Sequence, residues 1–209
     1  AVNFFRNRAP AEDTAAEIEK TGRRAILVKA DVGDLDDLGH LFAEVEKSFS
    51  GLDFFFFFAA SGYNRPVMQQ KPKGWDWTMN INARSLLFGA QLCVPLMEKR
   101  GGGYIVSISS QGSSHVMPDY VVVGSSKAAL EALTRYLAVE LSPMNIVVNA
   151  VSPGIVDTDA LHHFDIMNET NIMERAITST PAGRLVKADE VAGLVGFLCT
   201  PAASMIRGQ

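Results

Sequence analysis

Three side chains that together could deliver a proton lie within eighteen positions of one another, namely Ser110, Tyr120 and Lys127. Ser110 follows an apolar, strand-like run, and Tyr120 precedes Lys127 by seven positions. A lysine ammonium near a phenol favours the phenolate and moves the tyrosine pKa towards neutral pH. Each residue alone is unremarkable. We therefore predict a proton-donating site on condition that the fold brings all three to one crevice.

A second group of candidate residues follows two other apolar runs. Arg6 and Arg8 come directly after "AVNFF", and Asp31 and Val32 come after "AILVKA". In a dinucleotide-binding fold, an arginine at the first of these places can meet an adenosine 2′-phosphate. The Asp31 carboxylate could accept a hydrogen bond from an adenine amino group. A turn or helix-start role explains Asp31 equally well, and solvated arginines are common at helix starts.

The run "NIVVNAVS" ends in a sharp Pro153-Gly154 turn, followed four residues later by Thr158. A threonine at this place could hold a carboxamide group. His162 and His163 are adjacent, so on a helix they would point to different sides, and they predict no metal site.

The elements that must position these residues alternate between strand-like and helix-like patterns. The expected strands cover 1–5, 25–32, 54–58, 104–110 and 145–152, and the expected helices cover 10–22, 35–52, 75–103, 126–143 and 189–200. Strands of nearly continuous apolar character between helices are typical of a parallel sheet covered on both faces. The sequence therefore predicts an α/β fold with a doubly wound parallel sheet. Such a fold binds its ligands beyond the carboxyl ends of the strands.

Composition and length agree with one enzyme-sized domain over 1–209 and exclude several other classes. The net charge of −4 is unlike the basic excess of a nucleic-acid-binding protein. No apolar run is long enough to span a bilayer and no signal peptide is present, so we expect a cytoplasmic protein. The two cysteines, Cys93 and Cys199, are far apart and are expected to be reduced.

Four motifs resemble those of the short-chain dehydrogenase/reductase superfamily over nearly the whole chain. They are "MNINA" with Asn80, "IVSISS" with Ser110, "DYVVVGSSKAALEALTRYLAVEL" with Tyr120 and Lys127, and "NAVSPGIVDT" with Pro153, Gly154 and Thr158. Most of the superfamily places the tyrosine four positions before the lysine, where this chain has Val123. The seven-position spacing is that of the enoyl-acyl-carrier-protein reductases. With the serine kept at 110, the chain is most similar to the bacterial reductase III group.

This resemblance implies a Rossmann-type three-layer sandwich and a reaction. NADPH would reduce the trans-2 double bond of an enoyl thioester carried by acyl carrier protein, in fatty acid synthesis. Tyr120 would stabilise the enolate oxygen, Ser110 would orient the substrate or nicotinamide, and Lys127 would hold the ribose. Asn80 would support the lysine through water. The implied cofactor contacts are Arg6, Arg8, Asp31, Val32, Ala59, Ala60, Lys127, Pro153, Gly154 and Thr158.

Several family features are missing from the sequence. The Thr-Gly-x-x-x-Gly-x-Gly loop that binds the pyrophosphate does not occur in it, nor does the final strand with Asp-Gly-Gly. We expect the first strand with its loop, and the last strand, to belong to a longer protein. The phenylalanine run 54–58 is expected to be a central strand buried on both faces, with Phe57 and Phe58 at the family's asparagine positions. Residues 160–184 are expected to form a substrate-covering lid.

Two other functions and two partners complete these expectations. A 3-oxoacyl or other carbonyl reductase of the same superfamily shares every residue above except the tyrosine spacing. An inactive nucleotide-binding scaffold would agree with the missing loop. The resemblance implies a homotetramer built on the helices that start at Trp75 and near Ser125. Basic residues that could meet the acyl carrier protein are Arg65, Lys71, Lys73 and Arg184.

Overall fold

Five parallel strands form the centre of the chain in a computed structural model that describes residues 1–158 and 170–209. β1 (Val2–Phe4) pairs with β2 (Leu27–Lys29), and β3 (Phe54–Phe57), β4 (Gly103–Ile108) and β5 (Ile146–Val151) form a second parallel set in the order β3-β4-β5. Four strands fall within runs that the sequence predicts as strands, and β4 begins one residue before its predicted run, at Gly103, which the sequence analysis assigns to the end of the preceding helix.

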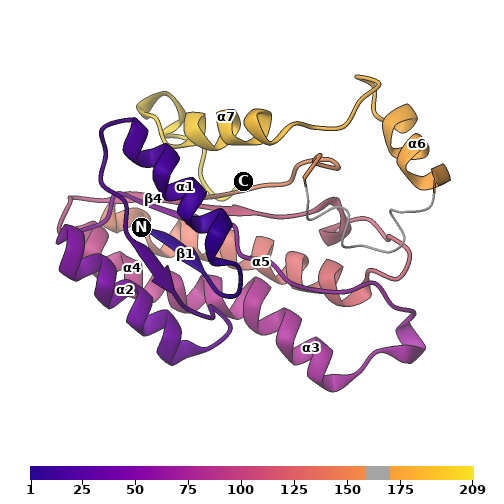
Figure 1. Cartoon of the computed structure of the whole chain (residues 1–209), viewed down its shortest axis with the longest axis horizontal. Coiled ribbons are helices and arrows are strands. Elements are labelled where there is room, and N and C mark those ends of the chain that lie inside the picture. The colour runs from indigo at the N-terminus through magenta and orange to yellow at the C-terminus, as the bar shows by residue number, and fades with distance from the viewer. Residues whose placement is uncertain (159–169) are drawn as a thin grey trace.

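The helices follow the predicted alternation. They are α1 (Arg8–Lys20), α2 (Leu35–Phe49), α3 (Pro72–Met79), α4 (Ser85–Glu98), α5 (Val121–Glu140), α6 (Thr170–Ser179) and α7 (Ala188–Leu198). α1 and α7 lie on one side of the strands, and α2, α4 and α5 lie on the other (Figure 1). The predicted doubly wound α/β sandwich is therefore confirmed.

Local sequence explains where α1 and α2 begin and end. The Asp34 side chain accepts hydrogen bonds from the backbone N–H groups of Asp36 and Asp37, so it caps the N-terminus of α2. Ser50 ends the same helix in the left-handed conformation. Gly22 has a φ of 76° just after α1, which glycine adopts without steric cost. The apolar face of α2 then packs on the core through Leu38, Leu41, Phe42 and Val45.

The predicted helix over 75–103 is continuous but not uniform. A π-helical turn, η2 (Asn80–Arg84), joins α3 to α4. π-turns are rare and occur often at functional sites. This turn contacts the N-terminal half of α5, where Tyr120 and Lys127 are found.

The phenylalanine strand differs from its prediction. β3 is hydrogen-bonded only to β4, and no described strand pairs with its other edge. Its side chains alternate: Phe57 is buried, whereas Phe54, Phe56 and Phe58 are 45%, 45% and 55% exposed. The exposed rings stack on one another at centroid distances of 5.9 and 5.8 Å. The expectation of a central strand buried on both faces is wrong for the described chain, because β3 lies at the edge of its sheet and the face that carries Phe54 and Phe56 is exposed.

The region expected to form a lid is described only in part. Residues 160–169 lie outside the described residues, and α6 and the turn to α7 make up the remainder. The two ends of the region are tied together where Val186 donates to the Ile155 carbonyl at 3.0 Å and Asp157 donates to the Val186 carbonyl at 2.9 Å. Its role as a lid stays a prediction. Among the described helices, none combines the length and apolar character that crossing a bilayer requires.

Candidate active site

Tyr120 immediately precedes α5 and lines a cavity of about 480 Å³, here called the tyrosine cavity. Its other lining residues include Arg65, Val67, Gly112, Ser113 and Met117. The Tyr120 hydroxyl donates to the Ser110 Oγ at 3.4 Å. This contact brings together two of the three residues that the sequence predicts as a proton-donating site.

Glycine is required on the face of the Tyr120 ring. A Cβ at Gly112 would lie 2.5 Å from the ring's Cε1, and a Cβ at Gly124 would lie 2.6 Å from the Gly112 carbonyl oxygen. Both distances are too short for a real side chain. The sequence reasoning did not single out either glycine, because the close approach depends on how the loop after β4 folds back onto α5.

Lys127 lies on α5 about two turns beyond Tyr120, so the two side chains share a face of the helix. It is 6% exposed, and its Nζ donates to the Ile108 carbonyl oxygen at 2.7 Å. Burial lowers the Lys127 pKa from 10.5 to about 8, because the charged form loses solvation. Among the described residues the other two ammonium donors have no partner, and Lys127 lines neither cavity.

The residue four positions before Lys127 cannot take the role of Tyr120 as proton donor in this chain. Val123 is 4% exposed and packs closely against Gly62. A Cβ added to Gly62 would lie only 2.2 Å from the Val123 Cγ2. A valine packed this closely carries no proton-donating group. Tyr120 is therefore the phenol that the N-terminal end of α5 presents to the site.

The structure brings Asn82, and not Asn80, into contact with α5. Asn82 is fully buried, and its Nδ2 donates to the Ser126 Oγ at 2.9 Å and to the Ser61 carbonyl at 2.8 Å. Its Oδ1 accepts from the Ser61 N–H at 2.8 Å. The half-buried Asn80 makes no side-chain hydrogen bond among the described residues. The motif "MNINA" contains both asparagines, and the π-turn decides which one faces Ser126, next to Lys127.

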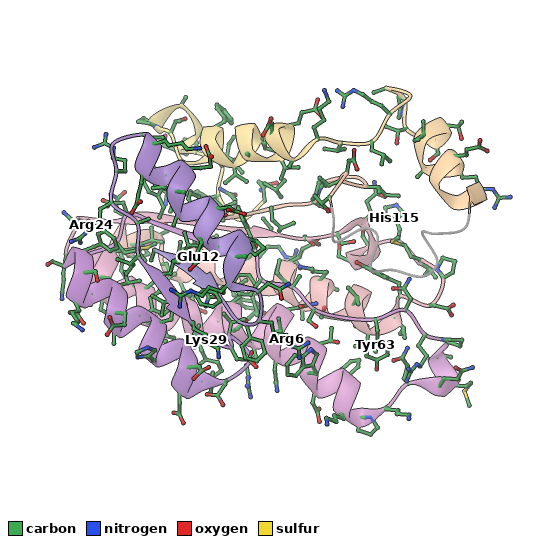
Figure 2. The ribbon with its side chains drawn as sticks, viewed as in Figure 1. Arg6, Glu12, Arg24, Lys29, Tyr63 and His115 are labelled. Atoms are coloured by element: carbon green, nitrogen blue, oxygen red, sulfur yellow. The ribbon has the colours of Figure 1, made fainter. Side chains whose placement is uncertain are left out.

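Arg6 lines a second cavity of about 740 Å³ that runs along β1 and β3 to their carboxyl ends and reaches the end of β2, here called the sheet-end cavity. Its lining includes four more predicted cofactor residues, Asp31, Val32, Ala59 and Ala60. The Arg6 guanidinium carbon lies 5.8 Å from the centroid of the Trp77 ring, beside α3 (Figure 2). The Trp77 indole N–H donates to the Ser61 Oγ at 2.8 Å, which fixes the ring. Sequence reasoning missed Trp77.

Two predicted cofactor residues have local partners. Arg8 is exposed and pairs with Glu12 at 2.7 Å, one turn along α1, and it does not line the sheet-end cavity. The Asp31 Oδ1 accepts from the Gly33 N–H at 2.8 Å, so the carboxylate also shapes the turn after β2. Asp31 therefore both shapes the turn after β2 and lines the sheet-end cavity.

Pro153, Gly154 and Thr158 follow β5 but line neither cavity. Thr158 is exposed and is the last described residue before 159–169. The carboxamide contact predicted for it stays a prediction. His162 and His163 lie outside them.

Comparisons with known proteins give the chain a family. The profile of the family described as "Enoyl-(Acyl carrier protein) reductase" matches residues 1–209. A 1-cyclohexenylcarbonyl-CoA reductase of Streptomyces collinus is 36% identical over 208 residues, which are 100% of this chain and 74% of that protein. The human dehydrogenase/reductase SDR family member 4 is 31% identical, with 98% of this chain and 73% of its own length covered.

Solved structures match the fold closely. A putative short-chain alcohol dehydrogenase from Sinorhizobium meliloti 1021 superimposes with a TM-score of 0.93 and 31% identity, covering 99% of this chain and 81% of that one. A 7α-hydroxysteroid dehydrogenase in complex with NADH and 7-oxo glycochenodeoxycholic acid gives a TM-score of 0.92 and 30% identity, covering 100% and 81%. The likeness in fold extends over 99% and 100% of this chain.

Proposed function

Because the chain belongs to the short-chain dehydrogenase/reductase superfamily and is therefore an NAD(P)H-dependent oxidoreductase, we propose that it reduces the trans-2 double bond of enoyl thioesters. The coarser activity, reduction of a carbonyl or enoyl substrate, follows from the family. The finer assignment has one main support: the phenol at the site is Tyr120, seven positions before Lys127, while Val123 is buried at the alternative position.

The described residues divide the work of such a reduction between them. The Tyr120 hydroxyl donates a hydrogen bond to the thioester carbonyl oxygen and stabilises the negative charge that develops there. When the phenol proton turns from the Ser110 Oγ to the substrate, the Ser110 hydroxyl donates to the phenol oxygen instead and holds it in place. The positive charge of Lys127, on the same face of α5, favours the phenolate after the proton has left. The nicotinamide supplies the hydride when the cofactor is bound.

The sheet-end cavity fits the adenosine end of a nicotinamide cofactor. It combines a guanidinium, a carboxylate and two small side chains at the ends of parallel strands, where this fold class binds nucleotides. We propose NADPH over NADH because Arg6 lies in this cavity, with Phe5 and Trp77 near its guanidinium. Lys127 keeps two free ammonium donors for the nicotinamide ribose.

The tyrosine cavity supports an acyl thioester as substrate. Its rim exposes apolar side chains, with Val67 67% and Met117 38% exposed, which suit an acyl chain. Arg65 lines the same cavity, and the segment 64–74 carries three basic residues and no acid. This charge favours an acidic carrier such as acyl carrier protein. Arg184 contributes less to the attraction of an acidic carrier, because its guanidinium pairs with Glu190 at 2.6 and 2.8 Å.

Self-association into a homotetramer is part of the same proposal. The helix α5 exposes Tyr136 and Val139, which are 69% and 74% accessible, and Trp75 of α3 is 44% accessible. Large apolar side chains with this exposure are typical of helix faces that pack against another subunit. Location in the cytoplasm and a place in fatty acid synthesis remain predictions.

The substrate assignment is tested by comparing two thioesters of equal chain length. NADPH oxidation with a crotonyl thioester is expected to exceed that with an acetoacetyl thioester by at least tenfold in kcat/KM. Each substrate is offered on acyl carrier protein and on coenzyme A, which separates the carrier from the reaction. A preference for the keto substrate would identify the protein as a carbonyl reductase. Turnover of neither, with intact nucleotide binding, would identify the inactive scaffold.

The cofactor assignment predicts a specific effect of Arg6. The change Arg6→Leu is expected to weaken binding of adenosine 2′-phosphate about tenfold or more, the scale of one lost hydrogen bond to a charged group. Binding of adenosine 5′-phosphate is expected to stay the same. Isothermal titration of the protein with both nucleotides measures this without turnover.

Two further arginines serve as comparisons. Arg8→Leu is expected to change binding less than threefold, because Arg8 pairs with Glu12 outside the cavity. The exposed Arg23 makes no side-chain hydrogen bond or ion pair among the described residues, and Arg23→Leu controls for the lost charge. Equal losses of affinity for adenosine 2′-phosphate in all three variants would mean that the protein attracts the phosphate only through its overall charge.

A further inference from the structure

A carboxylate outside both cavities ties down the loop that carries Ser110. The Glu131 Oε1 accepts from the Ser109 Oγ at 2.5 Å and from the Ser113 Oγ at 2.6 Å. Distances this short are typical of hydroxyl groups that donate to an ionised carboxylate. Glu131 is half-buried and lies one turn after Lys127 on α5, on the same helix face.

The two serines that contact Glu131 flank the residues on which the site depends. Between them, Ser110 accepts from the Gly112 N–H at 3.2 Å and from the Tyr120 hydroxyl at 3.4 Å. Gly112 lies against the Tyr120 ring. A shift of the loop by a few tenths of an ångström would therefore change the contact between Ser110 and the phenol and also the wall behind the ring.

α5 holds this loop at two successive turns. Lys127 binds the Ile108 carbonyl oxygen at the end of β4, and Glu131 binds the hydroxyls of Ser109 and Ser113. Without Glu131, the helix would fix only the start of the loop. The residues after Ser110 would then be held by a few local hydrogen bonds in a short 3₁₀ turn, which is a weak constraint.

We propose that Glu131 is a positioning residue for reduction: through Ser109 and Ser113 it sets the placement of Ser110 against Tyr120. The proposal rests on the proposed function, in which the Tyr120 hydroxyl acts on the substrate oxygen. It assigns Glu131 no contact with substrate or cofactor, because Glu131 lines neither cavity.

The test uses Glu131→Gln in the full chain, with whichever thioester the unchanged enzyme prefers. We expect kcat to fall about tenfold or more, the scale of weakening charge-assisted hydrogen bonds. The KM for the cofactor and the Tm are expected to stay close to their original values. Hydrogen exchange of residues 109–114 is expected to become faster. Glu140→Gln, at the exposed end of α5, is the matched control and should change none of these.

A double-mutant cycle separates positioning from general stabilisation. Ser113→Ala is expected to lower kcat by about threefold to tenfold, and Glu131→Gln combined with Ser113→Ala should be little worse than Glu131→Gln alone. Unchanged kcat in Ser113→Ala and Glu131→Gln would overturn the proposal. A fall in Tm without a change in kcat or in exchange would do the same. If Glu131→Gln does not fold, Ser113→Ala decides.

If the proposed function is wrong, these experiments give a different set of results. The unchanged enzyme would then reduce no thioester or carbonyl substrate, and positioning for reduction would be refuted with it. The exchange measurement would still report whether Glu131 holds the loop. If instead the unchanged enzyme prefers a keto substrate, the Glu131 proposal survives and is measured on that substrate.

Discussion

Replacing Tyr120 by phenylalanine is expected to lower kcat about a thousandfold and to leave the fold intact. The change removes the phenol hydroxyl that the N-terminal end of α5 presents to the tyrosine cavity, 3.4 Å from the Ser110 Oγ. Loss of a preorganised donor to a developing oxyanion costs about a hundredfold to a thousandfold in kcat. Loss of an acid–base group has an effect of similar size. The ring itself still packs against Gly112, so Tm is expected to change little.

Steady-state kinetics and thermal unfolding of Tyr120→Phe measure both expectations. Tyr104→Phe is the matched control: Tyr104 lies in β4, stacked on Phe54 at 5.8 Å, and lines neither cavity. Full turnover by Tyr120→Phe would contradict the role assigned to this phenol and would favour a mechanism without it.

Replacing Lys127 by methionine is expected to lower kcat/KM by about a hundredfold to ten-thousandfold, the range for groups that act in proton transfer. In the proposed function, the lysine's charge stabilises the phenolate, and its remaining donors bind the cofactor ribose. In the unchanged enzyme, kcat/KM should fall as pH rises through about 8, because burial lowers the Lys127 pKa to about 8 and the charge is lost above it. Lys127→Met should lack this fall. A pH–rate profile of both enzymes checks the expectation.

The same lysine should give the free energy of unfolding the opposite pH dependence: this free energy should rise with pH, whereas kcat/KM falls. Its pKa is 10.5 in the unfolded chain and about 8 in the folded one, so between these values the unfolded state binds more protons. The cost of burying the charge is therefore full below pH 8 and shrinks as pH rises towards 10.5. Relative to Lys127→Met, the free energy of unfolding should increase by about 2 kcal/mol between pH 7 and pH 10. Denaturant unfolding at both pH values measures it, and a decrease would show that Lys127 is not buried as a charge.

The order of elements and the meeting of Ser110 with Tyr120 could be predicted from the sequence. Apolar runs and helical periodicity locate strands and helices, and parallel strands place their carboxyl ends at one edge of the sheet. The chain positions of Arg6, Asp31, Val32, Ala59 and Ala60 then follow, and these residues do line one cavity. Arg8 has the same sequence context as Arg6, and only the structure shows its pairing with Glu12.

Two errors have physical causes that a sequence pattern does not reveal. A π-turn inserts one residue per turn and rotates the side chains after it, so a motif with asparagines at 80 and 82 does not indicate which one faces α5. An apolar run such as 54–58 reads the same in a central strand and in an edge strand, because its neighbours are set by the rest of the fold. Glu131 and Trp77 were missed for a related reason: their partners are 16 to 22 positions away.

The sheet-end cavity is bounded by two strand edges that no described strand pairs with, one of β1 and one of β3. Its walls include Val2 and Phe4 of β1 and Phe55 and Phe57 of β3, as well as Arg6 and Asp31 at their ends. Any strand that occupied this space would bind the described chain and at the same time reshape the place where a nucleotide would bind. By linkage, strand and nucleotide would each change the other's affinity by the same factor. Addition of such a strand and binding of a nucleotide would then be one coupled equilibrium.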